Sequence, residues 1–439
     1  MNKLFSPASV ILATFFAALN SIAEPAELWR HLPPDIHPDR VRNLAAEIDN
    51  SGQQRVLRLD VIPSGETSAK GISWISIPPP AGGWDLNLSG AVDVLVKNTG
   101  LKPAEVTLWV VSTNGWDAVG AAATPLPGKS AVLSCQLRET YPDGTPKIDP
   151  GQISEIRIMI QKATTGSFEF SNLVASGKAE PWIRPPGRLE VPNMETGQPA
   201  AGKRIRYRLP GDETANIYCA IYFPPDWTPQ GRYPLIAEFP GNIFYRAAAC
   251  YSTGRPEQCV IGYGVTSGAG SIWVSLPFVD LSVGAIAESG FGSQQGEDTA
   301  AYALKVINHI CENLGGDREN IVLSGFSRGS IACGYIGLRN DKIAALWQGF
   351  IGCQHYDGSK WRQSNMADAV VRAPRFRGKA IFQIDNSRDK YGPVEEATLP
   401  EVKWTWEKSG LGYHATAMFL DDRPMMQNLR KWYADLTTE

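Results

Sequence analysis

An excess of charge of one sign is missing from this sequence. Its 439 residues carry 42 Lys and Arg against 45 Asp and Glu, which gives a formal net charge of −3. There is no basic surplus to replace the counterions around phosphate groups, and no long run of like charge occurs. A nucleic-acid partner is therefore not expected.

Cysteines in metal-binding spacing are also missing. The cysteines lie at positions 135, 219, 250, 259, 311, 333 and 353, and no two of them form a CxxC pair. This spacing argues against a zinc site, and no metal ligands are predicted. If the chain is exported, disulfides are permitted, and the odd number leaves at least one thiol unpaired. Cys250 and Cys259 are the expected pair.

Long apolar runs are rare, with one informative exception at the N-terminus. Lys3 precedes the run VILATFFAAL at residues 10–19, and the small residues Ser21-Ile22-Ala23 follow it. This pattern predicts a secretory signal peptide over residues 1–23, and hence a periplasmic or secreted protein. A membrane anchor would need a longer span, so no stable membrane anchor is expected. No oligomeric state is predicted.

The chain does contain enough apolar residues for ordinary cores, since 43% of it is hydrophobic and 20% charged. Its length predicts two or three domains. Between about residues 53 and 177, short runs rich in Val, Ile, Leu and Thr alternate with turn signals and show no helical periodicity. These runs are RVLRLDVIP, AVDVLVKN, AEVTLWVVST, SAVLSCQLR, EIRIMIQK and SFEFSNLVAS. They predict an all-β sandwich over residues 24–177.

Three segments of this half carry a resemblance to a known group of modules. VDVLVKNTGLKPAEVTLWVVSTNGW, PLPGKSAVLSCQLR and EIRIMIQKATTGSFEFSNLVASG, in this order, resemble the galactose-binding-like jelly-roll modules attached to some agarases and other polysaccharide-degrading enzymes. The resemblance implies a jelly-roll sandwich that binds carbohydrate. Trp116, beside Asn114, is a candidate substrate-binding residue because an exposed indole can stack on a pyranose ring. Alternatively, Trp116 packs on its own sandwich or on the neighbouring domain.

A linker is predicted at residues 178–188, where KAEPWIRPPGR has three prolines and a glycine. Beyond it, over residues 189–439, strand-like and helix-like segments alternate. Examples are YPLIAEFPG, SIWVSLPF, EDTAAYALKVINHICENLGG and GKAIFQID. Alternation of this kind predicts a mostly parallel sheet with helices on both faces.

The stretch IVLSGFSRGS at residues 321–330 places Ser327 between two glycines. In a strained turn from a strand into a helix, the positions two residues either side of a nucleophile come so close that side chains would collide. Gly325 and Gly329 meet this demand. The turn leaves the amide of Arg328 at a helix N-terminus, where it can donate to an oxyanion. The sequence resembles the α/β-hydrolase fold at this point, which implies that Ser327 is the nucleophile.

A serine nucleophile needs a general base within hydrogen-bond reach. Of the five histidines, His355 and His414 follow Ser327. The resemblance implies the order Ser, acid, His. His414, in GLGYHATAMFLDDRP just before the last predicted helix, is the expected base.

The acid is expected after the strand KAIFQI, which offers Asp385 and Asp389 in IDNSRDKYGP. Similar hydrolases have a G-x-x-D-like turn here with the carboxylate at its far end, and this resemblance favours Asp389. Asn386 replaces the usual glycine, which keeps Asp385 as an alternative.

A third candidate for the acid is Asp357 in QHYDG, after the preceding predicted strand. Some hydrolases take their acid from that loop. In the other interpretation, Asp357 lines the substrate cleft together with His355 and Tyr356.

The second oxyanion donor is expected after PLIAEF, where Gly241 lets the backbone approach the substrate and Asn242 offers its amide. An ordinary Pro-Gly-Asn turn is the alternative. The stretch Gly-Phe-Ser-Arg-Gly also resembles the Gly-Cys-Ser-Arg pattern of glucuronoyl esterases, which implies that Arg328 helps to hold the oxyanion. Its guanidinium could attract an acidic sugar. Otherwise Arg328 is a surface arginine on the first helical turn.

These residues predict acyl transfer without a metal or organic cofactor. The favoured hypothesis is an exported serine esterase that removes acetyl, other acyl or uronate ester groups from a polysaccharide or oligosaccharide. A prolyl-oligopeptidase-like serine peptidase is the enzymatic alternative, but the first half lacks the repeated blades of a propeller. The third hypothesis is a non-catalytic carbohydrate-binding protein built on a hydrolase scaffold.

Overall fold

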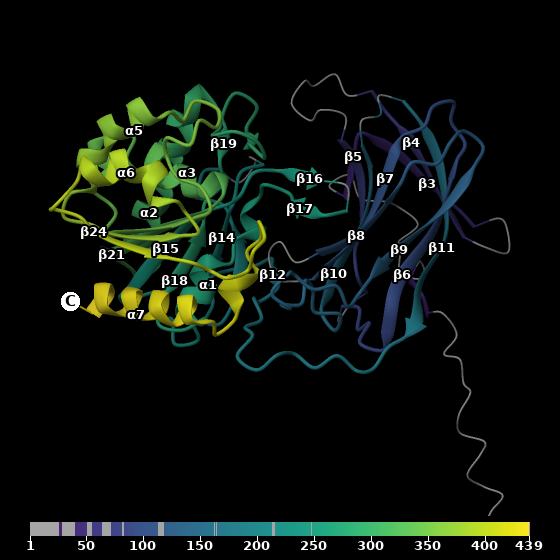
Figure 1. Cartoon of the computed structure of the whole chain (residues 1–439), viewed down its shortest axis with the longest axis horizontal. Helices are drawn as coiled ribbons and strands as arrows, with labels where there is room; N and C mark the ends of the chain where they lie inside the picture. The colour runs from purple at the N-terminus through teal and green to yellow at the C-terminus, as the bar shows by residue number, and fades with distance from the viewer. Residues whose placement is uncertain are drawn as a thin grey trace, which may run out of the picture.

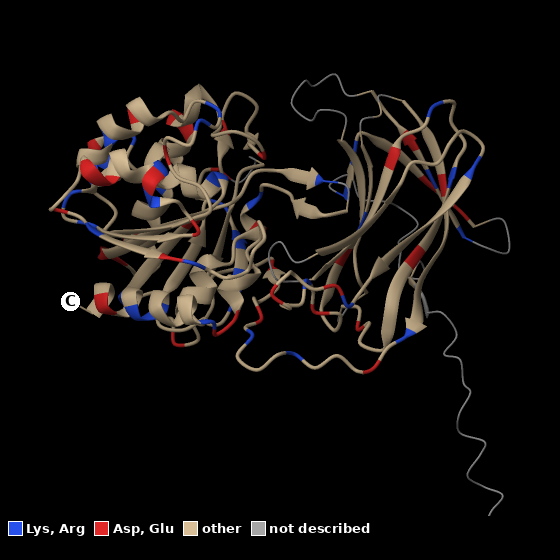
Figure 2. Cartoon of the chain, viewed as in Figure 1, with Lys and Arg blue, Asp and Glu red and all other residues tan. Residues whose placement is uncertain are grey.

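The computed structural model describes two β-rich parts that lie side by side (Figure 1). The described residues are 26–28, 40–50, 55–63, 72–80, 83–112, 118–161, 163, 165–212, 216–246 and 248–438. The expected signal peptide and Trp116 lie outside these ranges. Figure 2 shows acidic and basic residues interspersed over both parts, with neither sign gathered on one region.

The first part consists of two antiparallel sheets that share one apolar core. One sheet has the order β3 (Leu44–Asp49), β4 (Val56–Val61), β11 (Ser167–Lys178), β6 (Ser89–Asn98) and β9 (Ser130–Gln136), with β1 (Ala26–Glu27) also pairing with β11. The other has the order β2 (Val41–Arg42), β5 (Ile72–Ile77), β10 (Ile153–Gln161), β7 (Glu105–Ser112) and β8 (Ala118–Ala123). Alternating burial along β4 shows that its apolar residues face this core.

The second part is built on one nine-stranded sheet. Its order is β12 (Met194–Glu195), β13 (Arg204–Tyr207), β14 (Cys219–Tyr222), β18 (Ile272–Ser275), β15 (Tyr233–Phe239), β21 (Gly316–Phe326), β22 (Gly349–Cys353), β23 (Ala380–Ile384) and β24 (Lys403–Glu407). All strand pairs from β18 to β24 are parallel. The carboxyl ends of these strands therefore meet at one edge, where sites of such sheets are found.

Helices cover both faces of this sheet (Figure 1). On one face lie α2 (Glu297–Asn313), α3 (Arg328–Tyr335), α5 (Met366–Arg372) and α6 (Arg388–Glu396), with α4 (Asp341–Ala344) nearby. On the other lie α1 (Ile261–Thr266) and α7 (Pro424–Thr438). Each face buries its own apolar cluster, containing Val306 and Ile331 on one side and Ile261 and Met426 on the other. The expected mostly parallel sheet with helices on both faces is present.

A hairpin of β16 (Phe244–Arg246) and β17 (Cys250–Ser252) reaches from the second part toward the first (Figure 1). The ring centroid of Tyr251 lies 5.3 Å from that of Trp109 on β7, and that of Tyr245 lies 6.5 Å from it. An ion pair of 2.5 Å joins Arg42 to Glu288 across the same junction. The two parts therefore share a packed and charged interface.

All seven cysteines are free thiols, so the expected Cys250–Cys259 disulfide is wrong. Cys259 is buried beside the sheet with its Sγ 4.0 Å from the backbone oxygen of Glu238, and Cys250 begins strand β17. Within the described ranges, no helix is both long and apolar enough to cross a bilayer.

Candidate active site

The turn between β21 and α3 holds Ser327 in a strained backbone conformation. Ser327 has φ 55° and ψ −116°, outside the regions that residues with a side chain normally occupy. A Cβ on Gly325 would lie 2.1 Å from the carbonyl carbon of Gly329, and one on Gly329 would lie 1.9 Å from the oxygen of Phe239. Only glycine fits at either position, which is the physical reason for the two glycines around the serine.

The structure brings His414 to this serine. The Nε2 atom of His414 lies 3.1 Å from Oγ of Ser327, within hydrogen-bond distance. The imidazole packs at 4.7 Å from the ring of Phe326, the residue before the serine. Burial, followed by repulsion from His355, lowers the pKa of His414 to about 4. The imidazole is therefore neutral at physiological pH and can accept a proton.

His355 and Tyr356 come after strand β22, beside the histidine. The ring of His355 lies 5.6 Å from that of His414, and burial lowers the pKa of His355. Its backbone oxygen accepts hydrogen bonds from Ser330 and Asn386. Tyr356 instead packs on Tyr391 of α6, with 4.6 Å between ring centroids. His355 is thus a neighbour of the Ser–His pair, whereas Tyr356 contacts a helix.

Asp357 is engaged in a buried ion pair. Arg372 donates to both of its carboxylate oxygens at 2.8 and 2.9 Å, and Ser364 donates to it at 3.0 Å. This pairing anchors the loop after β22 to α5. A structural role explains these contacts better than a role in proton transfer does.

Asp389 lies on the first turn of α6, where it is exposed and accepts a hydrogen bond from Ser387. That hydrogen bond lowers the pKa of the Asp389 carboxyl. The carboxylate that orients a triad histidine is normally buried and bonded to it. The exposure of Asp389 does not fit this requirement, so the preference for Asp389 over Asp385 is not supported by the structure.

Asp385 follows strand β23 directly, with a positive φ of 57°. Its Oδ1 accepts from the backbone N–H of Ser409 at 2.8 Å, and its Oδ2 accepts from the Ser409 hydroxyl and from Nε2 of Gln354 at 3.2 Å. Gln354 also donates to the backbone oxygen of Tyr413, at 2.9 Å. Asp385 is therefore tied at two points to the segment that carries His414.

Arg328 is not a surface residue, which corrects that alternative, because its side chain is 1% exposed. The guanidinium donates to four backbone oxygens, those of Pro240 at 3.4 Å, Ala287 at 3.0 Å, Gly290 at 3.1 Å and Gly254 at 2.8 Å. Burial lowers its pKa to about 9. Four of its five N–H donors are thus engaged, and the side chain holds three loops around the serine turn.

Asn242 and Gly241 follow strand β15 next to the serine turn. The side chain of Asn242 is occupied, since its Nδ2 donates to Ile243 at 2.7 Å and its Oδ1 accepts from Gly290 at 3.2 Å. Its backbone N–H has no hydrogen-bond partner among the residues that the structure describes. This leaves the amide of Asn242 as a donor for a developing oxyanion.

Three residues that the sequence did not single out belong to this region. Gln354 and Ser409 bind Asp385, and Arg423 donates to the backbone oxygen of Ser409 at 2.6 Å. Gln354 had a usable signal, because it directly follows a strand at the edge where the active site forms. Ser409 and Arg423 had none, since their role depends on contacts that only the folded chain makes.

The strand order, the turn at Ser327 and the helices on both faces define an α/β fold of the hydrolase type. No protein-family model and no curated protein matches the chain.

Remote likenesses to solved structures exist. A thermostable esterase is 12% identical with a TM-score of 0.37, over 78% of this chain and 94% of the esterase. Dipeptidyl peptidase 4 of Porphyromonas gingivalis is 13% identical with a TM-score of 0.34, over 50% of this chain and 33% of the peptidase. An exo-β-agarase is 15% identical with a TM-score of 0.26, over 36% of this chain and 25% of the agarase. This chain spans a quarter of the agarase, and these likenesses assign no activity.

Proposed function

We propose that this chain is an exported serine esterase that hydrolyses ester groups on a polysaccharide or oligosaccharide. The observation that carries the proposal is the 3.1 Å distance between Nε2 of His414 and Oγ of Ser327 on a strained strand-to-helix turn. The carbohydrate class of the substrate is supported by the resemblance of the first part to modules of polysaccharide-degrading enzymes, and export by the apolar N-terminal run.

In the proposed mechanism, Ser327 attacks the ester carbonyl while His414 accepts its proton. The backbone N–H groups of Arg328 and Asn242 stabilise the oxyanion. His414 then protonates the departing oxygen, and a water molecule releases the acyl group from Ser327 by the same steps. Asp385 is our candidate for the acid, because it is held against the segment that carries His414.

The decisive test is Ser327→Ala in the full chain. Loss of the nucleophile should reduce turnover of a short-chain aryl ester by several orders of magnitude while circular dichroism and the melting temperature stay near wild type. The matched control is Ser282→Ala, which removes an exposed hydroxyl. Near-wild-type turnover in folded Ser327→Ala protein would end the assignment.

The substrate class is tested on the wild-type chain with acetylated polysaccharide, a methyl glucuronate ester and a dipeptide amide. We expect release of acetate or methanol from one of the first two at a higher kcat/KM than amide cleavage. Faster cleavage of the amide would replace the esterase proposal with the peptidase hypothesis.

A further inference from the structure

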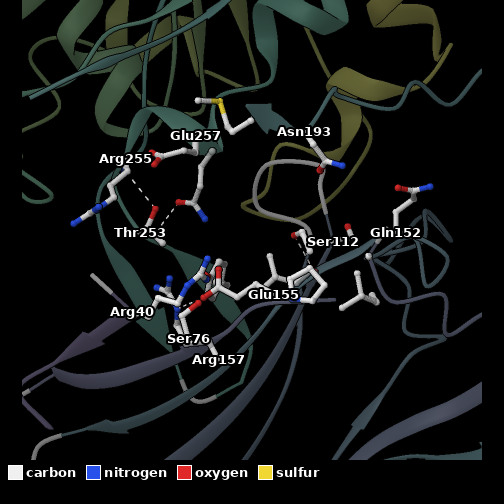
Figure 3. Close-up of a pocket in the computed structure, with 18 of the residues that line it drawn as sticks. Arg40, Ser76, Ser112, Gln152, Glu155, Arg157, Asn193, Thr253, Arg255 and Glu257 are labelled. Atoms are coloured by element: carbon white, nitrogen blue, oxygen red, sulfur yellow. Dashed lines mark hydrogen bonds and ion pairs between the residues drawn. The ribbon is translucent and has the colours of Figure 1, made fainter. Parts of the chain in front are cut away.

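A polar cavity lies at the junction of the two parts (Figure 3). Its volume is about 640 Å³, within the usual range of small-molecule sites. Strands β5, β7 and β10 of the first part line one side, and β13, the β16–β17 hairpin and residues 253–258 line the other. Ser327, His414 and Asp385 are not among its lining residues. The cavity is therefore separate from the candidate active site.

The lining carries a surplus of positive charge. It contains five arginines and three glutamates and, among its described residues, no lysine, histidine or aspartate. The ion pairs within it are Arg157–Glu155 at 2.6 Å, Arg206–Glu257 at 3.2 Å and Arg255–Glu288 at 2.8 Å. Every glutamate is thus paired within the cavity, and two arginines have no acidic partner there.

These two arginines are Arg204 and Arg40. Arg204 is buried, and its Nη2 donates to the backbone oxygens of Glu257 at 2.8 Å and Cys259 at 3.4 Å. Arg40 makes no ion pair with any residue that the structure describes, and it lines the same cavity as Ser76 and Arg157 (Figure 3). In a chain with a net charge of −3, this local surplus of two positive charges favours an anionic ligand.

Several polar atoms of the lining are buried without a hydrogen-bond partner among the described residues. They are Oγ of Ser112, Nε of Arg204, the hydroxyl of Tyr251, Oε2 of Glu257 and Nε2 of Gln258. Ser112, Arg204, Tyr251 and Gln258 are each less than 10% exposed. Buried polar groups normally have partners, and this set contains both donors and acceptors. The wall of the cavity is therefore polar behind its surface as well as at it.

We propose that this cavity binds an acidic sugar residue, with its carboxylate or sulfate group against Arg40 and its hydroxyls against the accessible polar side chains of the lining, Gln152, Asn193 and Thr253. The ring of Tyr245, half-buried in the lining, offers an apolar surface for the C–H face of a pyranose. The inference concerns binding and does not require Ser327 to be reactive. It gives the chain a ligand class that the serine site by itself does not define.

The cavity wall is connected to the serine turn through Arg328. Its guanidinium binds the backbone oxygen of Gly254, which lies between the lining residues Thr253 and Arg255. It also binds the oxygens of Ala287 and Gly290, on either side of the lining residue Glu288. An acidic sugar in the cavity therefore contacts loops that are held by the residue next to the nucleophile.

The test is calorimetric titration of the full chain carrying Ser327→Ala, so that no substrate is consumed. The probes are trigalacturonate, a sulfated galactose disaccharide and neutral galactotriose. We expect at least one acidic probe to bind at least tenfold more tightly than the neutral one, with an affinity that falls as salt is added. The acidic probe that binds more tightly identifies the anionic group as a carboxylate or a sulfate.

Two variants locate the binding. Arg40→Gln should weaken the acidic probe about tenfold, as expected for loss of one charge-assisted contact. Asn193→Asp places a negative charge on an exposed lining residue and should also weaken it, with little risk to folding. Arg377→Gln, which removes an exposed charge outside the cavity, should bind like the parent. The proposal would be overturned if no probe bound, or if the neutral and acidic probes bound with equal affinity. It would also be overturned if Arg40→Gln and Asn193→Asp both bound the acidic probe as tightly as the parent.

Discussion

At the residue scale, His414 combines a hydrogen-bonded position beside Ser327 with a strongly depressed pKa. Two causes lower this pKa. Burial is the larger one and belongs to the whole site, whereas the repulsion comes from a single neighbour, His355. A single substitution can therefore remove the smaller cause and leave the larger one in place.

The pH profile of ester hydrolysis should reflect this. A general base works in its neutral form, so kcat/KM should hold from neutral pH downward and fall with a midpoint near the His414 pKa of about 4, well below the usual 6.5. His355→Asn removes the repulsion, raises the pKa of His414 and moves the midpoint to higher pH. Stopped assays with an aryl ester, run on both proteins over the acid range, measure the midpoint of this fall. His309→Gln on α2 serves as control, and an unshifted midpoint in His355→Asn would refute the coupling.

Single substitutions also test which carboxylate is the acid. Asp385→Asn should reduce kcat by about 10⁴-fold, the effect seen when the carboxylate that fixes a catalytic histidine is replaced. Asp389→Asn should cost little because its carboxylate is exposed. Steady-state kinetics on both variants, with melting curves to show that each is folded, make the comparison. The opposite ranking would restore Asp389.

The sequence predicted the serine turn because its cause is local: two glycines flank the serine, and side chains at those positions would collide with backbone atoms. The preference for Asp389 came from the resemblance, because the local pattern does not separate Asp385 from Asp389, which stand four residues apart after the same strand. The start of α6 at Arg388 separates them, leaving Asp385 at the strand end and Asp389 on an exposed helical turn. That boundary depends on packing of α6 against the sheet, which a short polar stretch does not reveal.

At the element scale, the loops around the serine turn are held by one side chain. Arg328 bonds to carbonyls at positions 240, 254, 287 and 290, which come from three separate connections. The sequence indicated an arginine at a helix N-terminus. Its partners lie up to 88 residues away and are backbone atoms, so no residue type marked them in advance.

Arg328→Met should therefore lower the stability of the fold as well as the activity. Each buried carbonyl that loses its donor costs about 1–3 kcal/mol, so a loss of several kcal/mol is expected. Urea denaturation followed by fluorescence measures it. Arg318→Met, an exposed arginine bonded to Asn308, is the control and should change stability by less than about 0.5 kcal/mol. If Arg328→Met lowered kcat with unchanged stability, the guanidinium would act on the oxyanion instead.

At the scale of the whole molecule, the first part reaches the segment that carries His414. The turn after β9 places Tyr141 with its ring 5.4 Å from that of Tyr413, next to the histidine. Asp143 and Thr145 of the same turn each bind Nη2 of Arg423 at 3.2 Å. Arg423 in turn binds Ser409, the partner of Asp385. A chain of contacts thus runs from the first part to the candidate acid.

This connection predicts that the first part affects turnover of substrates too small to need a carbohydrate-binding module. Asp143→Ala should lower kcat on an aryl ester severalfold, because Arg423 loses one of its anchors and holds Ser409 less firmly. Glu169→Gln breaks an ion pair on β11 and should leave kcat unchanged. If Asp143→Ala also kept the wild-type kcat, the contacts of Asp143 would not affect the acid, and the first part would act on large substrates alone.

The hairpin β16–β17 also bears on the order in which the chain is made. All strands of the first part are complete by Lys178, so its two sheets can close while the ribosome is still adding the residues that follow. The nine-stranded sheet, in contrast, needs β24 at Lys403–Glu407, which is synthesised after every described strand of the first part. When the hairpin emerges, the surface around Trp109 is therefore already available to receive it. Synthesis from the N-terminus gives the later part a preformed surface to fold against, long before its own sheet can be completed.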